Sequence, residues 1–171
     1  MYTEQNRGFT VITNFGCDCH CKYCITKYHP ILQNAVTDKS KIDWDYLEKC
    51  IASSEAPTVN LSGGGDPFYH WQENIDFYNR MYELATKYGK QLDIHTRILP
   101  TDMGLIQKFR KIVLSIESYD TKAMEQLRMM LHEIEKTTKL RVINVLNERM
   151  TTEDCLTYIN KMHDIGVKQV T

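Results

Sequence analysis

The sequence lacks the features that direct a protein to a membrane or to nucleic acid. No apolar run in its 171 residues is long enough to span a bilayer, and residues 1–7 lack the basic start and apolar core of a secretion signal. The formal net charge of −1 gives no electrostatic basis for binding nucleic acid or a membrane surface. No internal repeat, linker or low-complexity segment divides the chain. We therefore expect a cytoplasmic protein with one domain over residues 1–171, and neither nucleic acid nor a membrane among its partners.

Cysteines are few but crowded, because four of the six fall between Cys17 and Cys24. Thiols this close are poorly arranged for disulfides, and in a reducing compartment they indicate a metal site. Cys17, Cys21 and Cys24 have the spacing Cys-x-x-x-Cys-x-x-Cys. Three thiolates can hold three irons of a 4Fe-4S cluster and leave the fourth iron open for a substrate or cofactor. The alternative is a structural zinc site that adds Cys19, with His20 as a further candidate ligand.

Short apolar runs rich in Val, Ile and Leu alternate with stretches of helical periodicity. This alternation predicts an α/β fold in which about six parallel strands, with helices on the outer face, curl into a partial (β/α) barrel. In such a fold, functional groups lie at the C-terminal ends of the strands. The sequence stops on the sixth predicted strand, so we expect either a very small protein of its class or a fragment of a longer one. The predicted strands are residues 9–13, 58–61, 91–96, 111–116, 140–146 and 167–171.

The last predicted helix has clear end signals. Thr151 or Thr152 is expected to cap its start, and Gly166 is expected to end it. Its predicted buried face consists of Leu156, Ile159, Met162 and Ile165.

A glycine run follows the second predicted strand, in the sequence Ser62-Gly63-Gly64-Gly65-Asp66-Pro67. Glycines at a strand end let the backbone approach a ligand closely and adopt positive φ, although a plain tight turn is the alternative. It is not a phosphate loop, because no Gly-Lys-Ser or Gly-Lys-Thr follows. Together with the cysteine spacing, the run resembles the radical S-adenosylmethionine (radical SAM) superfamily, where a Gly-Gly-Glu-Pro element takes this place.

The resemblance implies two cofactors, which are one 4Fe-4S cluster on Cys17, Cys21 and Cys24 and S-adenosylmethionine (SAM) chelated to the open iron. An electron from the cluster would break a carbon–sulfur bond of SAM, giving methionine and a 5′-deoxyadenosyl radical that abstracts hydrogen from a substrate. The substrate is not assigned, and in this superfamily it is sometimes a protein or peptide that enters through the open side of the barrel. The mechanism also requires an electron donor such as a flavodoxin or ferredoxin.

The resemblance also assigns residues to SAM. Tyr23 matches the aromatic residue that precedes the third cysteine and packs near the adenine, and Asp66 takes the place of the usual Glu. The loop expected to bind the SAM amino group comprises Gly63, Gly64, Gly65, Asp66 and Pro67.

Polar residues at the ends of later strands complete the expected site. Thr96 and Ser115 resemble positions that hold the methionine carboxylate, and Arg97 could pair with the same group. Glu117 could reach the ribose hydroxyls or the substrate, and Asn144 could hydrogen-bond the ribose. The alternative for each is a polar residue that caps a strand or faces solvent.

Two other classes of protein remain open. One is a non-enzymatic iron–sulfur or zinc protein, and the other is a degenerate radical SAM fold that acts as a binding module. The extra Cys19 and the Asp66 substitution are the hints toward degeneracy. The histidines outside the cysteine segment, His95 among them, lack metal-ligand spacing and are interpreted as surface or packing residues.

Overall fold

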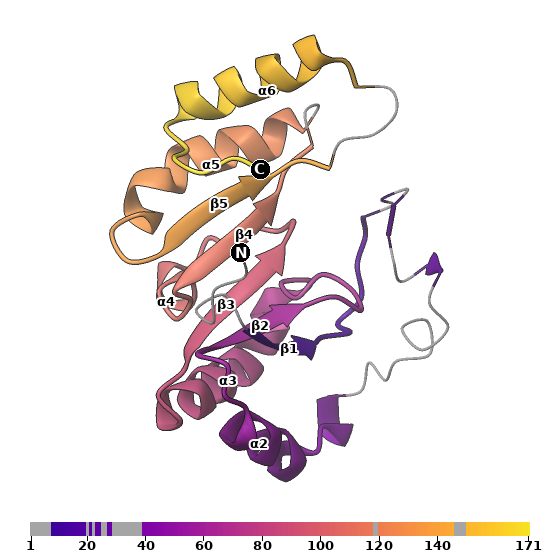
Figure 1. Ribbon diagram of the computed structural model, residues 1–171, viewed down its shortest axis with the longest axis vertical. Coiled ribbons are helices and arrows are strands. Elements are labelled where there is room, and N and C mark those ends of the chain that lie inside the picture. Colours follow the sequence, from indigo (N-terminus) through magenta and orange to yellow (C-terminus); the bar gives the residue numbers. More distant parts are fainter. Residues whose placement is uncertain are drawn as a thin grey trace.

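The computed structural model describes residues 8–19, 21, 23–24, 27–28, 39–117, 120–145 and 150–171. Within these residues, five strands form one parallel sheet in the order β1-β2-β3-β4-β5 (Figure 1). The strands are β1 (Gly8–Ile12), β2 (Thr58–Ser62), β3 (Gln91–Thr96), β4 (Lys111–Ser115) and β5 (Lys139–Ile143). The helices are η3 (Lys39–Lys41), α2 (Trp44–Ser53), η4 (Trp71–Asn74), α3 (Ile75–Lys87), α4 (Met103–Ile106), α5 (Thr121–Ile134) and α6 (Thr152–Ile165).

The predicted parallel α/β architecture is confirmed, but the described sheet is open and is not closed into a barrel. The predicted sixth strand is wrong in extent, because it is reduced to a single bridge between Val170 and Val142. The reason lies at the end of α6, where the N–H of Val167 donates to the carbonyl of Met162. Val167 therefore still belongs to the helix terminus, and pairing with β5 begins only at Gln169, whose carbonyl accepts from Val142.

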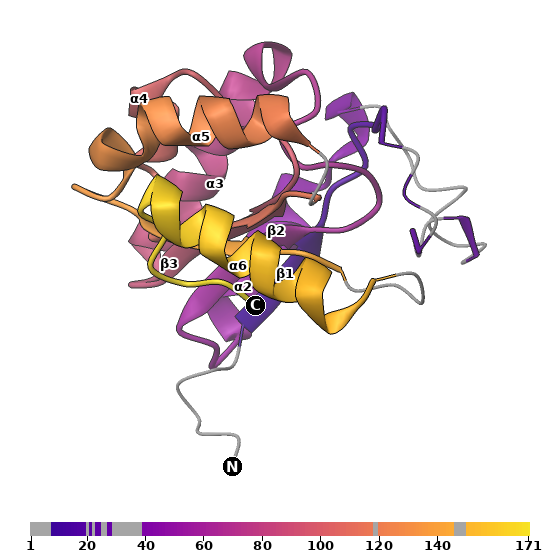
Figure 2. The same ribbon diagram turned by 90° about the horizontal axis from the view of Figure 1, so that it is seen from above.

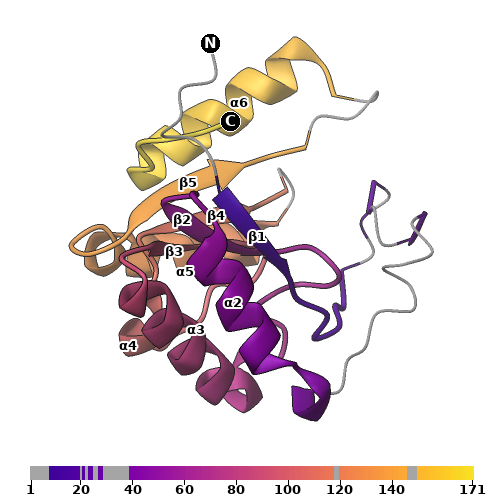
Figure 3. The ribbon, with the colours of Figure 1, turned by 60° about the horizontal axis from the view of Figure 1, so that its bottom comes forward.

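One face of the sheet is covered by helices and carries the hydrophobic core. Successive strands are neighbours, and right-handed connections between such strands place the helices on the same face. Figure 2 shows α3, α4 and α5 grouped on one side of the strands, and Figure 3 shows α2 next to α3. Buried strand residues on this face are Val59, Leu61, Leu92, Ile94, Ile112 and Leu114, and they share a core with Ile51, Tyr78, Met81, Ile106 and Leu127.

The other face of the sheet is mostly polar, and we call it the polar face. Side chains alternate along a strand, and paired residues on neighbouring strands share a face. The strand pairings therefore place the following residues on the polar face: Thr10, Ile12, Asn60, Ser62, Asp93, His95, Lys111, Val113, Ser115, Lys139, Arg141 and Ile143.

The sequence predicts the ends of α6 correctly and its buried face in part, because Met162 is buried and Ile165 packs against the core as expected. Thr151 forms a capping box with Asp154, and Gly166 ends the helix with a φ of 103°. Leu156 and Ile159 are 56% and 47% exposed, so the prediction that they are buried is wrong.

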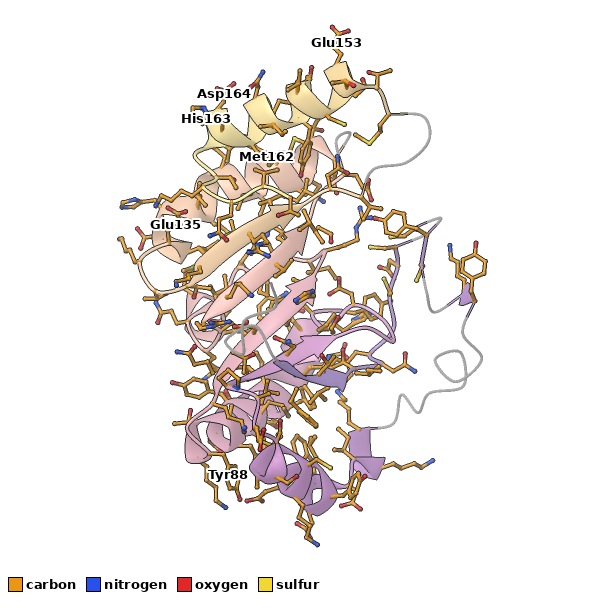
Figure 4. The ribbon with its side chains drawn as sticks, in the orientation of Figure 1. Tyr88, Glu135, Glu153, Met162, His163 and Asp164 are labelled. Carbon is orange, nitrogen blue, oxygen red and sulfur yellow. The ribbon has the colours of Figure 1, made fainter. Side chains whose placement is uncertain are left out.

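The buried positions of α6 are Tyr158 and Met162. The hydroxyl of Tyr158 donates to the carbonyl of Ile116 at 2.9 Å, which anchors the helix to the segment after β4. In Figure 4, Met162 points from α6 toward the sheet, whereas Glu153 and Asp164 point away. Among the helices of the described residues, none is both long and apolar enough to cross a membrane.

Candidate functional site

A cavity of about 650 Å³ lies at the carboxyl ends of the strands. In Figure 1 the arrowheads of the strands point toward the side of the molecule that carries the cysteine segment. One wall of the cavity comes from that segment, and a second comes from the glycine run at residues 63–67. Strand ends contribute the rest, namely His95, Thr96, Arg97, Ser115, Ile143 and Val145. Thus the two sequence motifs face one shared space.

All three predicted cluster ligands line this cavity, and so does Cys19. Among the described cysteines, Cys17, Cys21 and Cys24 form no disulfide. In the part of the chain that is described, no three His, Cys, Asp or Glu side chains are grouped so that they could hold a metal ion. The structure therefore brings the predicted ligands to one cavity without gathering them around one point.

Cys19 differs from a typical metal ligand in its environment. Its backbone N–H donates to the sulfur of Cys17 at 3.3 Å. Burial, followed by the charge of Cys17, raises the pKa of the Cys19 thiol to about 12.

The glycine run packs directly against the backbone that leads into the cysteines. A Cβ atom on Gly64 would lie 2.3 Å from the carbonyl oxygen of Thr13, and one on Gly65 would lie 2.4 Å from that of Gly16. The N–H of Asp66 donates to the same Gly16 oxygen at 2.9 Å. Two of the three glycines are thus required by close backbone approach, which a plain turn would not need.

Gly63 has a different role from the other two glycines. Its φ is 68°, and a Cβ atom there would meet nothing within 4 Å. Because Gly63 also lines the cavity, it leaves open space where a ligand can approach the backbone.

Asp66 is buried, at 5% exposure, and joins the glycine run to the end of β3. Its Oδ1 accepts hydrogen bonds from Phe68 N at 2.8 Å and Thr96 Oγ1 at 2.6 Å, and its Oδ2 accepts from Arg97 N at 2.6 Å. Burial raises the pKa of Asp66, and these three hydrogen bonds oppose the rise. The geometry gives Asp66 a positioning role, while its expected contact with the SAM amino group stays a prediction.

Thr96 and Pro67 are also occupied by contacts within the protein. The Thr96 hydroxyl accepts from Ile98 N at 2.9 Å besides donating to Asp66. The carbonyl of Pro67 accepts from the hydroxyl of Tyr78 at 2.6 Å. Both residues line the cavity, so they shape its wall, and the expected contact of Thr96 with the SAM carboxylate stays a prediction.

A second network ties the cysteine segment to the ends of β3 and β4. Arg97 Nη1 lies 3.1 Å from the sulfur of Cys21 and 3.1 Å from Oε1 of Glu117. The hydroxyl of Tyr23 donates to the same Glu117 oxygen at 2.5 Å. Burial and this hydrogen bond raise the pKa of Tyr23, which keeps the donated proton on the phenol. Arg97, Glu117 and Tyr23 therefore form one unit beside a predicted cluster ligand.

The remaining predicted residues, Ser115 and Asn144, differ in whether they line the cavity. Ser115 lines the cavity as expected, but Asn144 does not. The amide nitrogen and oxygen of Asn144 are buried and have no hydrogen-bond partner among the described residues. The ribose contact expected for Asn144 stays a prediction.

Sequence reasoning missed five residues of the cavity, of which Gly16 and Lys27 lie next to or within the cysteine segment. His95 was interpreted as a surface or packing residue, yet it lines the cavity with Ile143 and Val145. Histidine spacing carried no signal for it. His95 lies two residues before Arg97, and because alternate residues of an extended chain share a face, this spacing could have indicated that both side chains face the cavity.

A comparison of the sequence with protein-family models and with curated proteins finds no match. The chemistry of the cavity must therefore be judged from its own residues. Thiols are the ligands that iron–sulfur clusters require, and a volume of about 650 Å³ falls in the range of small-molecule sites. The three cysteines supply the type of donor atom that such a cluster needs, although the described side chains are not gathered around one point.

Proposed function

We propose that this protein is a radical SAM enzyme with a partial (β/α) barrel fold. Cys17, Cys21 and Cys24 would hold a 4Fe-4S cluster, which would supply the electron for reductive cleavage of SAM and so the radical that would abstract hydrogen from the substrate. The observation that carries the proposal is that the spaced cysteines and the glycine run form two walls of one cavity at the carboxyl ends of parallel strands.

The residues around the cysteines have defined tasks in this proposal. Arg97 donates to the sulfur of Cys21 at 3.1 Å, which fixes the position of that sulfur. Glu117 holds the guanidinium of Arg97, and Tyr23 holds Glu117. Asp66 keeps the glycine run against the end of β3, so that the backbone of Gly63 stays beside the open space.

The proposal requires an electron from outside the protein, and a flavodoxin or ferredoxin is the proposed donor. Ile143 and Val145 give the cavity an apolar wall next to β5. The polar face, on which the described residues form no helix layer, is the proposed side of substrate entry.

A structural zinc site is the second candidate, because Cys19 lines the same cavity as the three spaced cysteines. Four thiols can hold zinc in a closed tetrahedral site that has no catalytic function. Only Cys17, Cys21 and Cys24 have the spacing that matches the cluster motif, and Cys19 lies outside it. The two candidates therefore differ in whether Cys19 is needed for metal binding.

Anaerobic reconstitution with iron and sulfide tests the proposal. Wild-type protein should bind about four irons per chain and should bind SAM in an equilibrium assay, and Cys17→Ala, Cys21→Ala or Cys24→Ala should lose the cluster. Cys19→Ala and Cys50→Ala are matched controls and should retain it. Tight zinc without iron–sulfur absorbance would contradict the proposal, and a stable cluster that binds no SAM would favour a degenerate fold.

A further inference from the structure

The polar face extends from the cavity toward the amino ends of the strands, and there its basic residues outnumber its acidic ones. Ser115 and Ile143 line the cavity and pair with each other across β4 and β5. One row further down, Val113 pairs with Arg141, and in the next row Lys111 pairs with Lys139. Because alternate residues share a face, Arg141, Lys111 and Lys139 lie on the same surface as the cavity floor.

Asp93 is the carboxylate that lies among these cations. It is 1% exposed and accepts hydrogen bonds from Arg110, and its Oδ2 lies 3.3 Å from Nζ of Lys111. It is the one acidic residue that the described strands place on the polar face. Two cations thus already share Asp93, and Lys139 and Arg141 add positive charge that no described carboxylate pairs with.

Arg141 is the best placed of these cations to hold a ligand. It is half-buried, and its Nε donates to the side-chain oxygen of Gln169 at 3.4 Å, which steadies the guanidinium. The contact uses Nε, and among the described residues the terminal N–H groups of Arg141 form no further hydrogen bond or ion pair. A guanidinium presents its donors in a rigid fork that matches a carboxylate or phosphate group.

The spacing of the rows sets the size of the ligand. Residues two apart on a strand are separated by about 7 Å, so Arg141 lies about that far from Ile143 at the cavity. A small molecule can therefore place a carbon in the cavity while an anionic group contacts Arg141. His95 and Val113 lie beside Arg141 in the same row and complete the surface between the two points.

We propose that the substrate is a small organic anion whose carboxylate or phosphate group is bound by Arg141, with Lys111 and Lys139 adding positive charge. The inference rests on the proposed function for the reaction, but anion binding itself can be measured without that reaction.

Isothermal titration calorimetry with inorganic phosphate and with succinate tests the site on anaerobically reconstituted protein. Wild type should bind one of these anions saturably, and the stronger of the two identifies the preferred group. Arg141→Gln should weaken that binding by about tenfold or more, because a charge-assisted bidentate contact is lost. Arg128→Gln, at an exposed position of α5, is the matched control and should bind like wild type.

A charge-preserving variant covers the case in which Arg141→Gln does not fold. Arg141→Lys keeps the charge but loses the fork, and should weaken binding by several-fold. Unchanged affinity in folded Arg141→Gln or in Arg141→Lys, or no saturable binding of either anion by wild type, would overturn the inference. Either result alongside intact SAM cleavage overturns the anion site alone. Arg141-dependent anion binding in a protein that cannot cleave SAM overturns the proposed function alone.

Discussion

Replacing Asp66 tests whether this residue holds the glycine run to the end of β3. Its carboxylate is buried and accepts three hydrogen bonds, from Phe68 N, Thr96 Oγ1 and Arg97 N. In Asp66→Asn, one amide oxygen can still accept from Phe68 and Thr96. The amide NH₂, however, would face the N–H of Arg97, so one hydrogen bond is replaced by two opposed donors.

The magnitudes follow from these contacts. A hydrogen bond to a charged group contributes about 1.5–3 kcal/mol, and relief of the buried charge offsets part of its loss, so Asp66→Asn should lower the free energy of unfolding by about 2 kcal/mol. Asp66→Ala leaves the N–H groups of Phe68 and Arg97 without this acceptor, whereas the Thr96 hydroxyl can still donate to the carbonyl of Ile98, 3.1 Å away; the change should cost about 4 kcal/mol. Thr96→Val removes one of the same hydrogen bonds, so its effect should fall short of additivity with Asp66→Ala by about 1 kcal/mol.

Urea unfolding at pH 7, followed by circular dichroism, measures these differences. Asp164→Asn is the control, because the side chain of Asp164 is 82% exposed and the change should stay within about 0.5 kcal/mol. A loss below about 0.5 kcal/mol for Asp66→Ala, or full additivity with Thr96→Val, would refute the positioning role of Asp66.

Three further predictions follow from the described contacts. Gly65→Ala should lower the free energy of unfolding by about 3 kcal/mol and reduce iron uptake, because its Cβ atom would lie 2.4 Å from the Gly16 oxygen. Gly104→Ala is the control, since the nearest atom to its Cβ would be 3.2 Å away, and it should cost less than about 1 kcal/mol in the same urea assay. Thr151→Ala removes the capping box of α6 and should cost about 1 kcal/mol in urea unfolding, and an unchanged midpoint would contradict the role of this cap. Burial raises the pKa of Asp66 above its ordinary value of 3.8, so the folded protein holds this proton more tightly than the unfolded chain. The stability contributed by protonated Asp66 is therefore full below pH 3.8 and falls as the pH rises through the folded pKa. The difference in unfolding free energy between wild type and Asp66→Asn should therefore shrink from pH 3.8 toward neutrality. An increase of this difference with pH would contradict the raised pKa of Asp66.

The strands of the sheet could be predicted because Val, Ile and Leu recur at alternate positions, on the face that the helices cover. The predicted bounds 91–96 match β3, and 58–61 match β2 to within one residue. The segment 167–171 has the same composition, but Val167 is bonded to the end of α6. Apolar character alone cannot separate a strand from a buried helix terminus.

The buried face of α6 shows a similar limit. Apolar residues fall on two overlapping stripes of this helix, one with Leu156 and Ile159 and another with Tyr158 and Met162. The second stripe is buried, because it places the Tyr158 hydroxyl on the carbonyl of Ile116. That partner is 42 residues away in the chain and has no signature in local sequence.

The cysteine and glycine motifs could be read from spacing because each is local in the chain. The networks that position them could not, since they join distant segments. Arg97 and Cys21 are 76 residues apart in sequence but 3.1 Å apart at Nη1 and Sγ. Thr96 and Asp66 became a hydrogen-bonded pair only when the parallel register brought β2 and β3 together.

Production of 5′-deoxyadenosine tests the central proposal most directly. Reconstituted wild-type protein is reduced with dithionite in the presence of SAM, and the nucleoside is quantified by liquid chromatography. The account predicts 5′-deoxyadenosine from wild type and from Cys19→Ala, and none from Cys17→Ala, Cys21→Ala or Cys24→Ala. A fully reconstituted and reduced cluster that yields no 5′-deoxyadenosine, even with electrons supplied by flavodoxin, would contradict it.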